Sequence, residues 1–266
     1  MVRDQRPIGV FDSGLGGLTV ARALIDLLPA EHLCYFGDTG RFPYGPKPAD
    51  EVTKYAFEIA DLLLDRGVKV LVVACNSASA AALDLLAERV DVPVIGVIEP
   101  GIRAAREATR RGRVGVIGTV GTISSGAYQR AAAEHAPDLE LTCAACPGFV
   151  EFVESGEVES DQVHVLAERL LAPVRAAAVD TLVLGCTHYP LLARTIADVM
   201  GPDVVLVSSA EETAFEVRAR LAGGPTPPAE AIRREFVTSG DVTTFRALAG
   251  RFLGPEVEHV EAWSWS

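Results

Sequence analysis

The chain has 266 residues, 49% of them apolar, which suffices for one large folded domain or two of ordinary size. Its 24 basic and 36 acidic residues give a net charge of −12, so no nucleic-acid partner is expected. No apolar stretch reaches about 18 residues and the N-terminus lacks a signal-peptide pattern, which predicts a cytoplasmic protein without a membrane partner. Five cysteines, an odd number, favour reduced thiols over a disulfide framework.

Short β-rich runs alternate with helical patterns along the chain. The runs lie at 7–11, 32–37, 68–74, 92–98, 113–118, 139–143, 180–185, 203–208, 235–240 and 256–260. Between the first two, Leu18, Ala21, Ile25 and Leu28 recur at helical spacing. This alternation predicts an α/β fold of βαβ units, with mostly parallel sheets flanked by helices.

The first strand leads into FDSGLGG (Phe11 to Gly17), which opens a helix. It lacks the full G-x-G-x-x-G pattern of a dinucleotide site, and a tight turn with Asp12 or Ser13 as a helix cap is the favoured alternative. The second strand leads into GDTGRFPYG (Gly37 to Gly45), either a plain turn or a loop that offers Tyr44 and Gly45 to a small polar ligand.

Two later strands both end in a cysteine. The third predicted strand ends in VVACNSASA (Val72 to Ala80) and the seventh in LVLGCTHYP (Leu182 to Pro190). Each thiol therefore stands before a helix-compatible segment, where the helix dipole and free amides are expected to lower its pKa. Ligands of such sheets bind beyond the carboxyl ends of the strands, which is where both cysteines lie.

This repetition predicts two pseudo-symmetric lobes with the active site in the cleft between them. Residues 1–98 plus 209–266 form the expected first lobe, with Cys75, and residues 99–208 the second, with Cys186. The segment AGGPTPPAE (222–230) is expected to be an exposed connection. The pair in CAAC, Cys143 and Cys146, lacks the further ligands of a zinc site, so a structural role is favoured over a redox or metal role.

Two matched thiols suit one kind of chemistry better than others. A hydrolase or transferase needs one nucleophile and one base, so a second equivalent thiol has no role there. Inversion of a carbon centre needs one group that removes a proton and another that delivers one to the opposite face. These groups must be alike, because the reverse reaction exchanges their tasks.

At this point the sequence resembles the glutamate racemase family, within the aspartate/glutamate racemases. The resemblance covers nearly the whole chain and rests on motifs that occur in this order: IGVFDSGLGGLTV, YFGDTGRFPYG, VVACNSASA, VIGVIEPG, VGVIGTVGTI, CPGFVEFVESGE and LVLGCTHYPLL. It implies cofactor-independent interconversion of L- and D-glutamate, which supplies D-glutamate for peptidoglycan synthesis. It implies no metal site, and a homodimer is expected.

The resemblance also implies roles for individual residues. Cys75 is similar to the thiol that acts on D-glutamate and Cys186 to the one that acts on L-glutamate. Asp12 looks like the carboxylate beside the first thiol and His188 like the imidazole beside the second, with Glu154 as a further acidic residue on that side. The alternative for Glu154 is a solvated helix-face carboxylate, since Glu151 and Glu157 are close in sequence.

A second set of positions matches the family's substrate-binding residues. These are Asp12, Ser13, Tyr44, Gly45, Asn76, Ser77, Thr119, Thr122, Thr187 and His188. Ser77 departs from the threonine found in many members, but it keeps the hydroxyl. Two other functions stay open at this point: a relative that acts on aspartate or another small acid, and a non-catalytic ligand-binding protein of the same fold.

Overall fold

Two parallel β-sheets organise the chain, which the computed structural model describes over residues 4–221, 232–257 and 259–265. The first sheet contains β1 (Ile8–Asp12), β2 (Leu33–Gly37), β3 (Val70–Val73), β4 (Val94–Ile95), β9 (Arg234–Thr238) and β10 (Val260–Ala262), in the order β10-β9-β2-β1-β3-β4. The second contains β5 (Arg113–Gly118), β6 (Glu140–Ala145), β7 (Thr181–Gly185) and β8 (Val205–Val207), in the order β6-β5-β7-β8. All strand pairs among the described residues are parallel.

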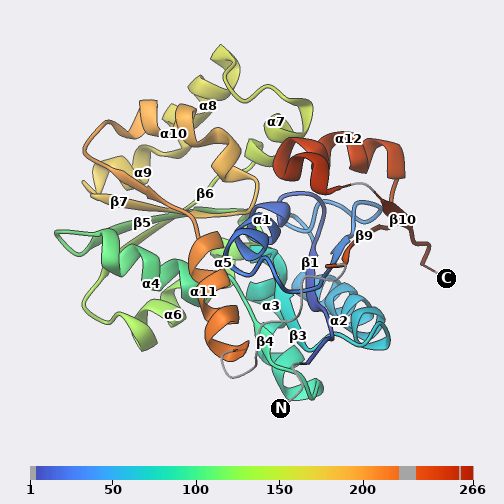
Figure 1. Cartoon of the computed structure of the whole chain (residues 1–266). Helices are drawn as coiled ribbons and strands as arrows, with labels where there is room; N and C mark the ends of the chain where they lie inside the picture. The colour runs from blue at the N-terminus through green and yellow to red at the C-terminus, as the bar shows by residue number, and fades with distance from the viewer. Residues whose placement is uncertain (1–3, 222–231, 258, 266) are drawn as a thin grey trace.

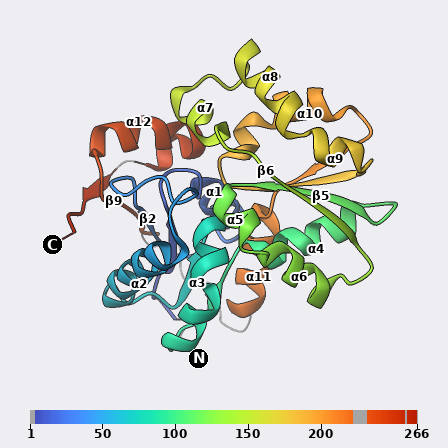
Figure 2. The ribbon, with the colours of Figure 1, turned by 180° about the vertical axis from the view of Figure 1, so that it is seen from behind.

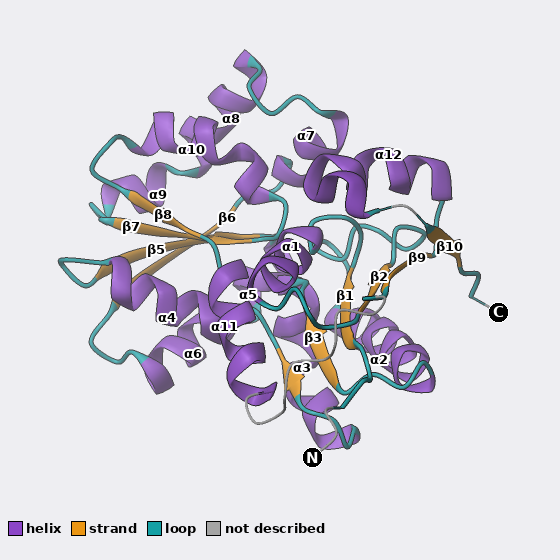
Figure 3. Ribbon diagram, in the orientation of Figure 1, coloured by secondary structure: helices purple, strands orange, loops and turns teal. Residues whose placement is uncertain are grey.

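Helices cover both faces of each sheet (Figures 1 and 3). On the first sheet, one face carries α1 (Leu18–Leu27), α11 (Ala210–Leu221) and α12 (Val242–Leu253), and the other carries α2 (Ala49–Asp65) and α3 (Asn76–Arg89). On the second sheet, one face carries α7 (Phe149–Ser155), α8 (Asp161–Leu170), α9 (Ala172–Ala176) and α10 (Ala193–Met200), and the other carries α4 (Ile98–Ala108) and α6 (Ala127–His135). The predicted α/β fold with two helix-flanked parallel sheets is thereby confirmed.

The central strands show why the sequence folds this way. Every residue of β1, β3 and β7 is buried, as the continuous runs VLVVA and TLVLG at β3 and β7 predict for strands covered on both faces. Successive side chains point to opposite faces, so Val10 packs under α1 while Phe11 packs under α2 and α3.

Two predicted strands differ from the structure. The run at 92–98 forms only the short β4, because Ile98 already begins α4. The run at 256–260 is mostly not a strand, because a 3₁₀ turn occupies Gly254–Glu256 and β10 starts at Val260. The predicted connection at 222–230 lies outside the described residues, and the lobe boundaries at 98/99 and 208/209 stay a prediction.

The two lobes meet along helices that follow the strands. α11 packs against both α1 and α4, and the short helix α5 (Val120–Ser124) packs against α3, as Figure 2 shows from behind. Strands β9 and β10 extend the first sheet beyond β2, which brings the two ends of the chain into one sheet. Over the described residues, no helix has the length and apolar character needed to cross a membrane.

Candidate active site

The first cysteine, Cys75, lies between β3 and α3 and is the N-cap residue of that helix. Its side chain is 5% exposed, and its sulfur lies 3.7 Å from the hydroxyl oxygen of Ser13. The prediction of a lowered pKa is wrong for this thiol. Burial and the negative charge of Asp12 raise the pKa of Cys75 to about 12, and they outweigh the helix amide of Ala78 and the donors of Ser13.

The second cysteine, Cys186, follows β7 directly and is equally buried. His188 lies beside it, and the imidazole Nε2 is 2.8 Å from Oε1 of Glu154 on α7. Burial alone would lower the pKa of His188. The bonds to Cys186 and Glu154, together with the charge of Asp12, reverse this and raise the pKa to about 10. The ring is therefore an imidazolium at neutral pH.

Asp12 ends β1 and is fully buried. Its carboxylate accepts a hydrogen bond from the backbone amide of Gly14 at 2.8 Å and one from the hydroxyl of Thr187 at 3.3 Å. Burial raises its pKa, against the opposing effects of His188 and these donors. The family resemblance places Asp12 beside the first thiol, and the structure shows that it also contacts the motif that carries the second thiol.

Glycines allow the two lobes to approach closely at this point. A Cβ atom on Gly16 would lie 2.3 Å from Oγ1 of Thr187 and 2.6 Å from Nδ1 of His188. The turn before α1 therefore has no room for a larger residue. The segment FDSGLGG forms the tight turn expected as one alternative, and Asp12 accepts hydrogen bonds from backbone amides of this turn. The expected helix cap differs, because the N-cap residue of α1 is Gly17 and not Asp12 or Ser13.

Three hydroxyls form a triangle across the junction of α3 and α5. Ser77 lies 3.0 Å from Thr119 and 3.3 Å from Thr122, measured between the side-chain oxygens, and Thr119 lies 3.0 Å from Thr122. Next to them, the amide of Asn76 donates to the hydroxyl of Tyr128 at 2.9 Å. The serine hydroxyl at position 77 thus links α3 to α5.

The hydroxyl of Tyr44 is not directed to a ligand. The side chain is 1% exposed, and its hydroxyl donates to the buried carboxylate of Asp38. The carbonyl of Gly45 accepts a hydrogen bond from the amide of Gly121 at 3.0 Å, which joins this segment to the second lobe. The backbone of the segment is therefore the part available to a ligand.

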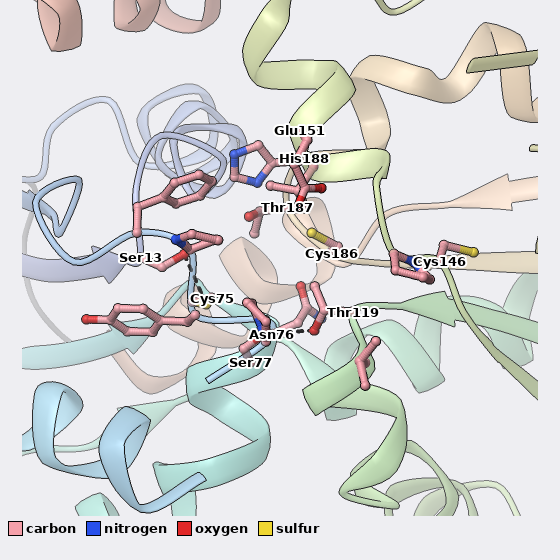
Figure 4. A pocket seen from close by; sticks show the side chains of 18 of the residues that line it. Ser13, Cys75, Asn76, Ser77, Thr119, Cys146, Glu151, Cys186, Thr187 and His188 are labelled. Atoms are coloured by element: carbon pink, nitrogen blue, oxygen red, sulfur yellow. Dashed lines mark hydrogen bonds between the residues drawn. The ribbon is translucent and has the colours of Figure 1, made fainter. Parts of the chain in front are cut away.

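One small cavity, with a volume of about 80 Å³, lies where these segments meet. Figure 4 shows Ser13, Cys75, Asn76 and Ser77 reaching it from one lobe and Thr119, Cys186, Thr187 and His188 from the other. Its size fits an amino-acid-sized ligand better than a nucleotide. Among the described residues that line it there is no lysine or arginine, so an anionic ligand would be held by amides, hydroxyls and His188.

Comparison with known proteins agrees with this geometry. The sequence pattern of the Asp/Glu/Hydantoin racemase family matches residues 8–216, which is most of the chain. The chain belongs to the Asp/Glu/Hydantoin racemase family. Within this family, a protein named glutamate racemase from Mycobacterium leprae is 56% identical over 261 residues, covering 96% of this chain and 94% of the relative.

Solved structures of the racemase family superpose closely on this chain. A glutamate racemase isoform from Bacillus anthracis has a TM-score of 0.90 at 43% identity, over 98% of this chain and 97% of its own. A glutamate racemase from Francisella tularensis, solved in complex with D-glutamate, has a TM-score of 0.89 at 34% identity, with 98% of each chain covered.

The racemase site includes residues that sequence reasoning did not assign. Additional lining comes from 42–46 and 146–151: Phe42, Pro43, Pro46, Cys146, Pro147, Gly148, Val150 and Glu151, together with Val120. The Phe42 ring lies 5.6 Å from the imidazole of His188, measured between centroids. The motifs that contain these residues were visible in the sequence, but not which of their side chains face the cavity.

Some predicted site residues do not line this cavity. They are Asp12, which is bonded to Thr187, Thr122, which is fully buried, and Glu154, which is bonded to His188. The CAAC cysteines are both free, and burial raises their pKa values, to about 11 for Cys143 and about 12 for Cys146. Within the described ranges no group of three or more potential metal ligands occurs.

Proposed function

We propose that the protein is a glutamate racemase that interconverts L- and D-glutamate with two cysteines. The observation that carries the proposal is that Cys75 and Cys186, at corresponding strand ends of two sheets, line one small cavity. The racemase family and relatives named glutamate racemase at about 55% identity support it.

In the proposed reaction, one thiolate breaks the Cα–H bond and the opposite thiol protonates the carbanion on its other face. From D-glutamate, Cys75 takes the proton and Cys186 delivers one. From L-glutamate, the two cysteines exchange tasks. The α-proton is weakly acidic, so the site must stabilise the negative charge that develops, and pre-oriented amides and hydroxyls in a dry cavity do this.

The environment of Cys75 supports a protonated resting state for that thiol. With a pKa of about 12, Cys75 is a neutral thiol in the free protein and can act as a proton donor. The imidazolium of His188 places a positive charge beside Cys186. Glu154 is proposed to hold His188 in place, and Asp12 to join the two thiol motifs through Thr187.

The substrate's two carboxylates are proposed to bind amide and hydroxyl donors, with His188 supplying a positive charge in the same cavity. The candidates are Ser13, the Tyr44-Gly45 backbone, Asn76, Ser77, Thr119 and Thr187, with Thr122 supporting Ser77 and Thr119. We further propose that the enzyme works in the cytoplasm as a homodimer, needs no cofactor, and supplies D-glutamate for peptidoglycan.

Circular dichroism of the purified protein with L-glutamate, without added cofactor or metal, tests the activity. The signal should decay to zero as the racemate forms. Faster decay with L-aspartate than with L-glutamate would instead favour an aspartate enzyme, and absence of α-proton exchange with solvent deuterium would favour a non-catalytic binding protein.

Serine substitutions test the two-thiol mechanism. Cys75→Ser and Cys186→Ser should each lower kcat/KM by about 10²- to 10⁴-fold, the usual contribution of a general base, while the melting temperature stays near that of the wild type. Undiminished racemisation by either variant would exclude a two-base reaction.

A further inference from the structure

The C-terminal segment contacts the loop that lines the cavity. The guanidinium of Arg41 lies between two aromatic rings, 3.8 Å from the ring centroid of Trp265 and 3.9 Å from that of Tyr55 on α2. The Trp265 ring also packs edge-on against Phe36 of β2, with 5.5 Å between centroids. Stacking of this kind fixes a planar guanidinium in orientation as well as in position.

A buried carboxylate connects this stack to the loop. Asp38, which is fully buried, accepts hydrogen bonds from the indole Nε1 of Trp265 at 3.0 Å, the hydroxyl of Ser239 at 2.6 Å and Nε of Arg41 at 2.7 Å. It also accepts a bond from the hydroxyl of Tyr44. One carboxylate thus holds the C-terminal segment, the turn after β9 and the cavity loop together.

The loop has little freedom to move where it reaches the cavity. Gly45, next to Tyr44, accepts a bond from Gly121, and a Cβ atom at position 45 would lie 2.8 Å from Thr119. Tyr44, Gly45 and Thr119 all line the cavity. Any shift of Tyr44 toward or away from Asp38 would therefore change the wall formed with the second lobe.

We propose that Trp265 is a positioning residue that, through Arg41 and Asp38, holds the Tyr44-Gly45 segment in place for substrate binding. The proposal rests on the proposed racemase function. Trp265 lies outside residues 8–216, the part that matches the family's sequence pattern, so that pattern gives it no role. Its contacts are with groups that do not touch the reacting carbon, so it should affect binding and not proton transfer.

The chain offers a matched control, since its two tryptophans are Trp263 and Trp265. Their rings are neighbours, 6.1 Å apart between centroids. The indole N–H of Trp265 donates to Asp38, whereas the buried indole N–H of Trp263 has no partner among the described residues. Phenylalanine at either position removes one indole N–H and keeps an aromatic ring, so the two variants differ in whether a bond to Asp38 is lost.

The test compares Trp265→Phe, Trp265→Ala and Trp263→Phe in the full-length protein, with KM and kcat measured from both enantiomers of glutamate. Loss of a hydrogen bond to a charged group corresponds to about tenfold or more in an equilibrium constant, and only part of it reaches the cavity wall. Trp265→Phe should therefore raise KM about fivefold, and Trp265→Ala, which also loses the stacked ring, about tenfold or more. kcat and its pH profile should stay at wild-type values, and Trp263→Phe should leave KM unchanged.

Arg41→Lys tests the same contact from its other side, because lysine keeps the charge but cannot stack as a plane or donate through Nε. Arg41→Lys should raise KM by about as much as Trp265→Ala does. Wild-type KM in both Trp265 variants, or an equal rise in Trp263→Phe, would overturn the positioning role while leaving the racemase function intact. A wild-type protein that does not racemise glutamate would refute the function itself, and isothermal titration with D-glutamate would then test whether the Trp265 variants weaken binding.

Discussion

Replacing His188 with asparagine tests the charge beside the second thiol. The pKa of His188 stands at about 10, against about 6.5 for a free imidazole, so its surroundings favour the protonated ring by about 5 kcal/mol in total. Cys186, Glu154 and Asp12 share this energy, with Cys186 the largest favourable contributor. Loss of about 2 kcal/mol of this charge stabilisation in the transition state corresponds to roughly a 30-fold change in rate.

We therefore expect His188→Asn to lower kcat/KM on the order of 30-fold near pH 7 to 8. The sign of the pH effect follows from the raised pKa. The ring is protonated below about pH 10, so the deficit of the variant should be constant up to about pH 9 and shrink as the pH rises through about 10.

Initial rates by circular dichroism, measured with both enantiomers from about pH 7 to 11, give the ratio of wild-type to variant kcat/KM at each pH. His164→Asn is a suitable control, because His164 lies half-exposed on α8, 3.9 Å from Glu168. A His188→Asn enzyme within about twofold of wild type, or a deficit that does not change across pH 10, would refute the assignment of an imidazolium at this position.

Two further substitutions examine the neighbouring contacts. Glu154→Gln keeps a hydrogen-bond acceptor for His188 but removes the charge, so kcat/KM should fall about tenfold and the upper pH limit of activity should move to lower pH. Glu157→Gln, at an exposed neighbouring position, should change neither quantity. Equal effects of the two substitutions would contradict the pairing of Glu154 with His188. Gly16→Ala places a methyl group against Thr187, so the free energy of unfolding measured by urea titration should fall by about 1–3 kcal/mol, and activity should be lost. Wild-type stability and activity in this variant would show that the lobes are not in close contact at Gly16.

The sequence predicted the fold well because its signals were local. Continuous runs such as those of β3 and β7 imply strands covered on both faces, and the structure contains them. The strand predicted at 256–260 was displaced because Gly254 and Pro255 begin a 3₁₀ turn, which apolar alternation does not reveal.

The site was harder to predict where its chemistry depends on tertiary packing. Strand ends showed where Cys75 and Cys186 would lie, but helix position alone suggested a lowered pKa for Cys75. Enclosure of the thiol and the nearby Asp12 have the larger effect. Likewise, the sequence suggested that Tyr44 faces a ligand, but in the structure its hydroxyl donates to Asp38. Two further partners of Asp38, Ser239 and Trp265, come from the opposite end of the chain.

The two halves of the site are alike in architecture but unequal in chemistry, with Ser13 beside Cys75 and an imidazolium beside Cys186. The two enantiomers of glutamate have the same free energy in water, so the equilibrium constant is one and kcat/KM must be identical in both directions. No substitution in either half can make the enzyme favour one enantiomer at equilibrium. The difference between the two thiols can therefore appear only in the separate kcat and KM values of each direction, while their ratio stays the same.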